Sequence, residues 1–180
     1  MNDTRLPTVI YFLLLTVGLL ACAHVYPQLP ERLASHFDAA GRPNGWQTKQ
    51  QFFTLALWMA GLSAVVTFLL PQLIAVLPAE FINLPHKGYW LAAQRRRETQ
   101  RYLRAKLTWF GCAILFVLLY GTTLSIEANL PGNGRFDSRA MLRVLVGFLL
   151  LLFAGTVVSL RHFYRLPEDA RKPDDGPLPK

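Results

Sequence analysis

The chain has 180 residues, of which 52% are hydrophobic, and a formal net charge of +8. That length suits a single domain, and the hydrophobic share slightly exceeds the usual composition of soluble proteins. Because the cations flank long uncharged stretches, we expect them to meet lipid headgroups, and we expect no nucleic-acid partner. No Lys, Arg, Asp or Glu occurs in four windows, which are residues 6–30, 50–79, 107–126 and 144–160.

Each uncharged window is long enough for a helix that crosses the hydrocarbon core of a bilayer, which takes about 17–20 apolar residues. Helices of a soluble bundle would carry a polar stripe, whereas these windows are apolar all round. The sequence therefore predicts an all-α integral membrane protein with four transmembrane helices and a structured extracytoplasmic loop between the first two. The expected spans are about 8–26, 52–77, 107–126 and 141–160, within a domain at 1–166, and a disordered cytoplasmic tail is expected at 167–180.

Several helix ends carry recognisable signals. Pro27 is expected to stop the first helix, because proline cannot continue one. Thr48 and Gln51 form a capping-box pattern at the start of the second helix. Asp137 or Ser138 is expected to cap the fourth.

The distribution of Lys and Arg predicts the orientation. With the N-terminus in the cytoplasm, thirteen of these residues lie in cytoplasmic segments and six in the outer loops. Cations are retained on the cytoplasmic side during insertion. We therefore expect a bacterial inner-membrane protein with both termini in the cytoplasm.

The two cysteines both lie inside predicted spans, so neither indicates an extracytoplasmic disulfide. Residues 19–22, Leu-Leu-Ala-Cys, also resemble the lipobox of bacterial lipoproteins, in which Cys22 would be lipidated after signal cleavage. Apolar sequence continues from there to Tyr26, which favours an uncleaved first helix. Both interpretations stay open.

The loop at residues 27–49 is the most informative stretch outside the windows. Its segment 41–45 predicts a turn, since Gly and Asn tolerate positive φ and Pro presets its own, and residues 34–38 suit a short extended segment. We expect this loop to cap the bundle and to contact a ligand or signal. The candidate contact residues are His36, Phe37, Asp38, Trp46 and Lys49.

A second candidate surface follows the second span, on the expected cytoplasmic side. It consists of Asn83, Pro85, Lys87, Tyr89, Trp90, Arg95, Arg96 and Arg97, and we treat it as a face for a cytoplasmic regulatory protein. The alternative is that the prolines shape a turn, the aromatic rings anchor at the headgroups, and the arginines set topology and contact lipid.

Two features of the second helix concern packing. Ala56, Ala60 and Ala64 recur every four residues, a spacing that lets helix backbones approach in lipid and allows a homo-oligomer, although alanine is also an ordinary helix former. Pro71 and Gln72 predict either a kink with a polar pocket or no more than the geometry of the bundle.

Two motifs resemble a bacterial family. They are Pro30, His36-Phe37, Gly41, Pro43, Trp46 and Lys49 in the outer loop, and Asn83-Leu84-Pro85, Lys87 and Tyr89-Trp90-Leu91 after the second span. With the spacing of the first three helices, they make residues 8–126 resemble the small membrane proteins of domain of unknown function 1648. That domain also forms the N-terminal part of immunity proteins against the sporulation-delaying toxin. Asp38 stands where the family often has Asn, and His86 interrupts the second motif.

Several absences narrow the expected function. No charged residue occupies the middle of a span, no catalytic or phosphate-binding motif occurs, and no spaced ligand pair joins His24, His36 and Asp38 as metal ligands. We expect no enzyme, no cofactor and no metal. The resemblance implies a non-enzymatic sensing or toxin-immunity-type module whose outer loop meets an extracytoplasmic peptide or stress signal. The alternatives are a small transporter or channel subunit, or a structural accessory subunit of a membrane complex.

Overall fold

The computed structural model describes residues 4–166, except for the side chains of residues 74, 75 and 79. The tail expected at 167–180 lies outside the described residues. Most of the described chain is helical, and four helices are long and apolar enough to cross a membrane. These segments are Arg5–Gln28, Lys49–Leu73, Arg96–Asn129 and Ser138–Tyr164, which confirms the prediction of four apolar helices.

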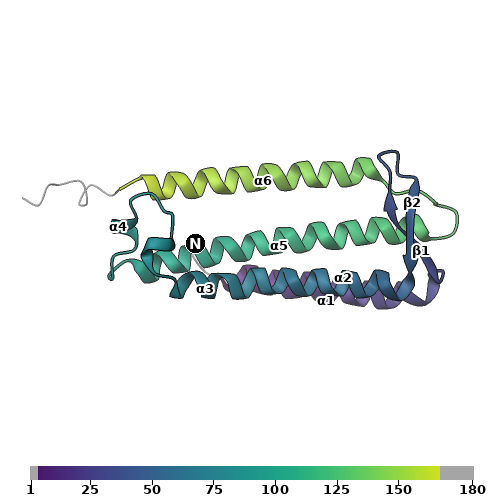
Figure 1. Ribbon diagram of the computed structural model, residues 1–180, viewed down its shortest axis with the longest axis horizontal. Helices are drawn as coiled ribbons and strands as arrows, with labels where there is room; N and C mark the ends of the chain where they lie inside the picture. Colours follow the sequence, from purple (N-terminus) through teal and green to yellow (C-terminus); the bar gives the residue numbers. More distant parts are fainter. Residues whose placement is uncertain (1–3, 167–180) are drawn as a thin grey trace, which may run out of the picture.

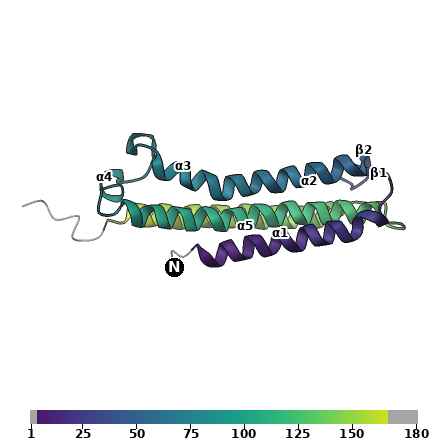
Figure 2. The ribbon, with the colours of Figure 1, turned by 90° about the horizontal axis from the view of Figure 1, so that it is seen from below.

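The helices run side by side along the long axis of the molecule (Figure 1). α5 is central, and α1, α2 and α6 all pack against it. Figure 2 shows α1 and α2 on opposite sides of α5. The long elements are α1 (Arg5–Val25), α2 (Lys49–Ala64), the π-helical turn η2 (Val65–Leu69), α3 (Leu70–Val76), α5 (Arg96–Asn129) and α6 (Ser138–Tyr164). The short ones are η1 (Tyr26–Gln28), η3 (Ala79–Phe81) and α4 (Lys87–Trp90).

The predicted capping signals are confirmed. The Thr48 N–H donates to Gln51 Oε1 at 3.1 Å, and the Gln51 N–H donates to Thr48 Oγ1 at 3.2 Å, so the capping box is complete. Asp137 Oδ1 accepts from the Ala140 N–H at 2.8 Å. Each cap satisfies N–H groups that the first helical turn leaves without a partner.

The second helix is irregular just before Pro71. Proline has no N–H, and its ring clashes with the carbonyl four residues back, here that of Thr67. The preceding turn is π-helical, and the Leu70 N–H bonds to the carbonyl of Val65, five residues back. The chain then continues as α3 to Val76. The irregularity expected at Pro71 is therefore a widened turn inside one long helical segment.

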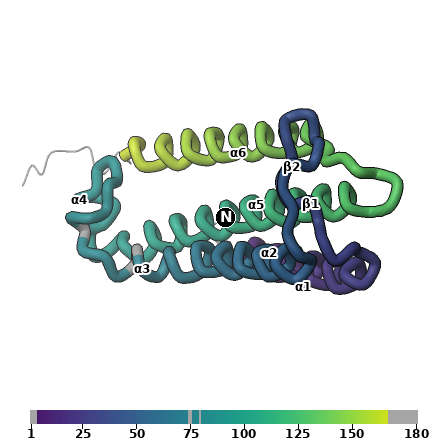
Figure 3. Tube along the Cα trace, turned by 45° about the vertical axis from the view of Figure 1, so that its right-hand side comes forward, coloured from purple at the N-terminus to yellow at the C-terminus, as the bar shows by residue number. Residues whose placement is uncertain are grey.

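The loop between α1 and α2 is a β-hairpin, so the all-α prediction was incomplete. β1 (Arg32–Phe37) pairs antiparallel with β2 (Pro43–Thr48), from Arg32 opposite Thr48 to Phe37 opposite Pro43, with irregular register between Ala34 and Phe37. Gly41 turns the chain with a φ of +75°, which glycine adopts without strain. Figure 3 shows the hairpin crossing one end of the bundle, from α1 and α2 toward α6.

The two ends of the bundle differ in composition. We call the end with β1 and β2 the hairpin end. The opposite end is the basic end, because α4 brings Lys87 there and the start of α5 and the last turn of α6 bring arginines. Two buried clusters lie between them. Leu29, Leu33, Phe52 and Ile126 pack beneath the hairpin, and Tyr11, Cys112 and Leu115 pack deeper in the bundle.

Candidate functional site: a cavity beneath the hairpin

Asn129, the last residue of α5, holds the hairpin to the bundle. Its side-chain oxygen accepts from the Ala34 N–H at 2.7 Å, and its side-chain nitrogen donates to the Ala34 carbonyl at 2.9 Å. The amide thus pairs with β1 as a neighbouring strand would. Because buried backbone groups need partners, this double contact fixes β1 over the end of α5.

The hairpin turn is held on its other side by the segment before α6. The Phe136 N–H donates to the Gly41 carbonyl at 3.0 Å. The backbones approach so closely that a Cβ at position 41 would overlap the carbonyl oxygen of Phe136. The Phe37 and Phe136 rings stack with centroids 4.9 Å apart. The hairpin therefore bridges α5 and α6.

Lys49 closes the base of the hairpin. Its Nζ lies 2.9 Å from a carboxylate oxygen of Glu31 and donates to the Leu29 carbonyl at 3.4 Å. The same ammonium lies 4.7 Å from the centre of the Tyr26 ring. The Lys49 side chain is only 11% exposed, so it joins the end of α1 to the start of α2.

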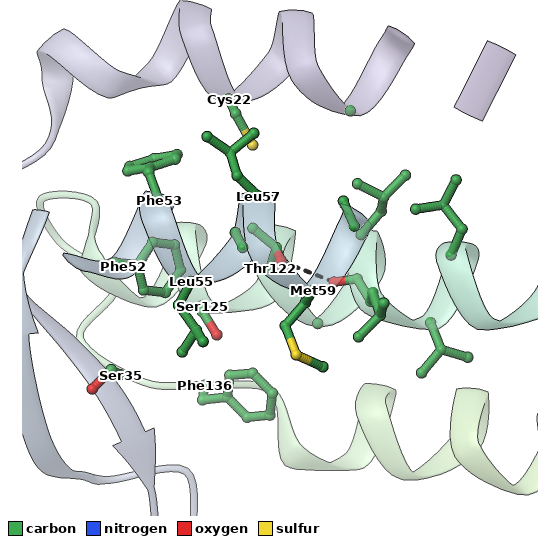
Figure 4. Close-up of a pocket in the computed structure, with 18 of the residues that line it drawn as sticks. Cys22, Ser35, Phe52, Phe53, Leu55, Leu57, Met59, Thr122, Ser125 and Phe136 are labelled. Atoms are coloured by element: carbon green, nitrogen blue, oxygen red, sulfur yellow. Dashed lines mark hydrogen bonds between the residues drawn. The ribbon is translucent and has the colours of Figure 1, made fainter. Parts of the chain in front are cut away.

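A cavity of about 840 Å³ lies beneath the hairpin, between α1, α2, α5 and the start of α6. Its wall is mostly apolar, and Figure 4 shows Cys22 of α1, Phe52, Phe53 and Leu55 of α2, and Phe136 around it. The size and chemistry suit a small ligand or an apolar side-chain cluster. Its polar lining comes from Ser35, His36, Asp38, Gln47, Thr122, Ser125 and Ser138.

The cavity is open on the side between α2 and α6. Two of its α2 residues, Leu55 and Met59, are 54% and 40% exposed. In Figure 4 the side chain of Met59 extends toward the side where Phe136 and α6 lie. An apolar group can therefore reach the cavity from the side of the bundle, between α2 and α6.

Residues 13–60 match the model of the family described as Domain of unknown function (DUF1648). The match covers 48 of the 180 residues, so the similarity to this family concerns that part of the chain. It contains most of α1, the whole hairpin and α2 as far as Ala60. No curated protein and no solved structure matches the chain.

The DUF1648 segment supplies most of the residues that line the cavity, from Leu15 to Ala60. It includes the first of the two motifs that carry the resemblance, between Pro30 and Lys49. The second motif, residues 83–91, lies outside the matched segment and at the other end of the bundle. Residues 13–60 thus form most of the cavity wall, and α5 and the start of α6 complete it.

The five outer-loop candidates do not all face the same space. His36, Phe37 and Asp38 line the cavity. Asp38 also shapes the turn, since its carboxylate accepts from the Arg42 N–H at 2.8 Å. Trp46 is 56% exposed and does not line the cavity, while Lys49 is engaged at the hairpin base. Within residues 4–166 no three His, Cys, Asp or Glu side chains gather to hold a metal ion.

At the basic end, Trp90 is part of the packing. Its indole N–H donates to the Phe163 carbonyl of α6 at 2.9 Å, and its own carbonyl accepts from Thr99 Oγ1 at 2.8 Å. Arg95 lies 3.9 Å from the centre of the Tyr89 ring. Trp90 therefore ties the segment before α5 to the end of α6.

The other candidates for a partner face are spread over the basic end. The Arg96 guanidinium donates to the Leu77 carbonyl at 2.9 Å. Pro85 is half-buried. The exposed members are Asn83, Lys87 and Arg97.

The alanines of α2 lie within the bundle. Ala56 lines the cavity, and Ala60 and Ala64 pack against the cluster of Tyr11, Cys112 and Leu115. Small residues here allow α1 and α5 to approach α2 in the same chain.

A buried polar contact next to these alanines was not predicted from the sequence. The Tyr11 hydroxyl donates to Ser63 Oγ at 3.2 Å, and Thr67 Oγ1 donates to the Ser63 carbonyl at 2.6 Å. A Cβ at Gly111 would overlap the Thr67 side chain, so α5 passes close to the π-helical turn. The sequence feature that could have indicated this contact is the spacing of Ser63 and Thr67, which lie one turn apart in a largely apolar helix.

Proposed function

We propose that this chain is a multipass protein of a bacterial cytoplasmic membrane and works without catalysis, as a sensing or toxin-immunity-type module. Its hairpin end faces outward, and its basic end and both termini face the cytoplasm. The ligand is an amphipathic peptide whose apolar side chains enter the cavity beneath the hairpin. The observation that carries this proposal is that cavity, apolar in its wall and lined at its end by polar groups of the hairpin.

Exposed side chains support the placement in a membrane. Large apolar residues lie outward on all the long helices, such as Trp58 at 74%, Val76 at 77% and Phe153 at 70% exposed. None of the most apolar stretch of α6 is buried within the chain. Water would oppose such a surface by about 25 cal/mol for each Å² exposed, whereas lipid covers it at no such cost.

The charge distribution supports the orientation. Arg95, Arg96 and Arg97 join Arg161 and Arg165 at the basic end, while the hairpin end carries fewer cations. Insertion retains Lys and Arg on the cytoplasmic side. The hairpin and its cavity then face the outer leaflet, where an extracytoplasmic peptide arrives.

The lateral opening supports an amphipathic ligand. A peptide lying at the membrane surface buries its apolar face in the headgroup region and keeps its polar face in water. The opening between α2 and α6 meets the apolar face, and His36 and Asp38 lie at the hairpin side for polar contacts. The proposed action at this wall is binding.

A cavity-filling variant tests the proposal. The probe is a Leu/Lys amphipathic helical peptide that carries a photoreactive benzophenone, added to the outer face of proteoliposomes. Cross-links are expected on cavity residues of α2 and α5. Ala56→Phe should remove them, while Ala154→Phe, which adds the same ring at an exposed position of α6 away from the cavity, should not. Ala56→Leu, a smaller filling, serves if Ala56→Phe disturbs the fold.

Two results would contradict the proposal. Cross-links spread evenly over exposed helix faces, and unchanged in Ala56→Phe, would show that the peptide binds only to the bilayer. Solute flux through the proteoliposomes that Ala56→Phe abolishes would instead indicate a transporter or channel subunit.

A cytoplasmic regulatory protein is the second proposed partner, bound at the basic end. Lys87 and Arg97 are exposed there, whereas Trp90 is committed to the fold. Lys87→Glu with Arg97→Glu should abolish co-purification of that protein. Arg135→Glu with Arg139→Glu, which alters exposed arginines near the hairpin end, should leave it intact. Equal loss in both pairs would count against a specific face.

A further inference from the structure

An open pocket of about 550 Å³ lies at the basic end, between the segment containing α4 and the last turns of α6. It lies at the opposite end of the bundle from the hairpin, where Figure 1 shows α4 and the end of α6. Its wall combines cationic, aromatic and aliphatic side chains. The lining residues are Trp90, Val158, Arg161, His162, Arg165 and Leu166.

The aromatic part of the wall is preorganised. Trp90 is held by its hydrogen bond to the Phe163 carbonyl, and the ring of His162 stacks on Tyr102 with centroids 4.3 Å apart and 11° between the planes. The Trp90 and His162 rings are themselves 5.0 Å apart. A ligand at this pocket therefore meets a wall whose side chains are already ordered, which lowers the entropy lost on binding.

The cationic part is available for an anion. Arg161 lies in the last turn of α6 and Arg165 follows the last residue of that helix, and both are exposed and line the pocket. Within residues 4–166 neither has a hydrogen bond or an ion pair with another side chain or carbonyl. The carboxyl end of a helix carries only about half a negative charge, which two guanidinium groups exceed. One of its carbonyls, that of Phe163, is already satisfied by Trp90.

We propose that this pocket binds the phosphate-bearing headgroup of an anionic phospholipid. Arginine suits phosphate, because its planar fork donates two hydrogen bonds at once. Val158 lies about two turns before Arg165, on the membrane side of the pocket, and offers an apolar contact for the glycerol and the start of an acyl chain. The combination of exposed arginines and an apolar contact at Val158 favours a lipid over a soluble phosphate. This inference rests on the membrane placement proposed above.

Matched arginine pairs test the site. The protein is reconstituted in nanodiscs of phosphatidylglycerol and phosphatidylcholine, extracted in mild detergent, and analysed by native mass spectrometry for retained phosphatidylglycerol. Arg161→Gln with Arg165→Gln should weaken retention roughly fivefold for each arginine removed. Arg97→Gln with Arg101→Gln removes two exposed cations at the same spacing and the same end, but outside the pocket, and should leave retention unchanged.

The outcomes separate the alternatives. Equal losses in the two pairs would overturn the proposal, because they would show general attraction between cations and lipid. Displacement of the lipid by glycerol 3-phosphate at comparable concentration would overturn the lipid assignment in favour of a free phosphate ligand. A wild-type chain that fails to float with liposomes contradicts the membrane placement itself, whereas a floating chain with no dependence on Arg161 and Arg165 contradicts only this site.

Discussion

The hairpin end and the basic end are both closed by contacts between distant parts of the chain, but they use different groups. At the hairpin end hydrogen bonds to strand backbone make the contacts, beside the stacked rings of Phe37 and Phe136. Asn129 pairs with both polar groups of Ala34, and the Phe136 N–H donates to the Gly41 carbonyl. At the basic end aromatic side chains make the contacts, and Trp90 reaches the Phe163 carbonyl. Strand backbone leaves N–H and C=O groups that must find partners, whereas a helix satisfies most of its own.

This difference explains why the two ends suit different roles. A hairpin fixed through its backbone holds His36, Phe37 and Asp38 in place over the cavity beneath it. An end closed by aromatic rings and surrounded by arginines suits an interface with headgroups, where amphipathic rings and cations prefer to lie. Substitutions that break the contacts of each end are expected to lower stability to different degrees, and they follow from the largest expected effect to the smallest.

Gly41→Ala should have the largest effect. It places a Cβ where it overlaps the Phe136 carbonyl oxygen, at a φ of +75°. Gly132→Ala is the matched control, because its φ is +88° and it has no neighbour within 4 Å of the added Cβ. Positive φ costs an alanine about 1–2 kcal/mol in either variant. Overlap with the Phe136 backbone should add about 1–3 kcal/mol to the loss in free energy of unfolding for Gly41→Ala alone. Equal losses, measured by denaturant titration in detergent, would contradict the close approach.

Asn129→Ala should have an intermediate effect at the same end. It leaves the Ala34 N–H, in a buried residue, without its acceptor, which costs about 1–3 kcal/mol. Asn133→Ala removes a side-chain donor to the Glu127 carbonyl at an exposed position and should cost less than about 1 kcal/mol. Hydrogen exchange should accelerate at the Ala34 amide in Asn129→Ala only. Unchanged exchange there would mean that another group holds β1.

Trp90→Phe should have the smallest effect, at the basic end. Phenylalanine keeps a ring against Phe163 but cannot donate to its carbonyl, so a loss of about 1 kcal/mol is expected. Tyr89→Phe is the control, since the Tyr89 hydroxyl has no hydrogen bond within the described residues. Limited proteolysis of the segment before α5 should speed up in Trp90→Phe and stay unchanged in Tyr89→Phe. Faster cleavage in both would attribute the effect to the rings and not to the hydrogen bond.

The helices could be predicted from sequence because their signals are local. The first span expected at 8–26 corresponds to Arg5–Val25, and the caps at Thr48 and Asp137 lie within three residues of the groups that they satisfy. Uncharged windows and capping residues act over one or a few turns, so a single sequence contains them in full.

The ends of the bundle could not be predicted, because their contacts join distant residues. The turn at Gly41 was expected, but its flanking strands pair with an irregular register that composition does not indicate. Asn129 lies 95 residues from Ala34, and Trp90 lies 73 residues from Phe163. Trp90 and Lys49 were chosen as contact residues for their chemistry, and both prove to have partners within the chain.

Thiol labelling tests most directly whether the two ends lie on opposite sides of a membrane. Ala40→Cys places an exposed thiol on the hairpin turn, and Lys87→Cys places one at the basic end. The unsubstituted chain, whose Cys22 and Cys112 lie within helices, reports the background. A membrane-impermeant maleimide added to intact cells should label Ala40→Cys at once and Lys87→Cys only after lysis. Labelling of Lys87→Cys in intact cells, with Ala40→Cys protected until lysis, would contradict the orientation on which the proposed function depends.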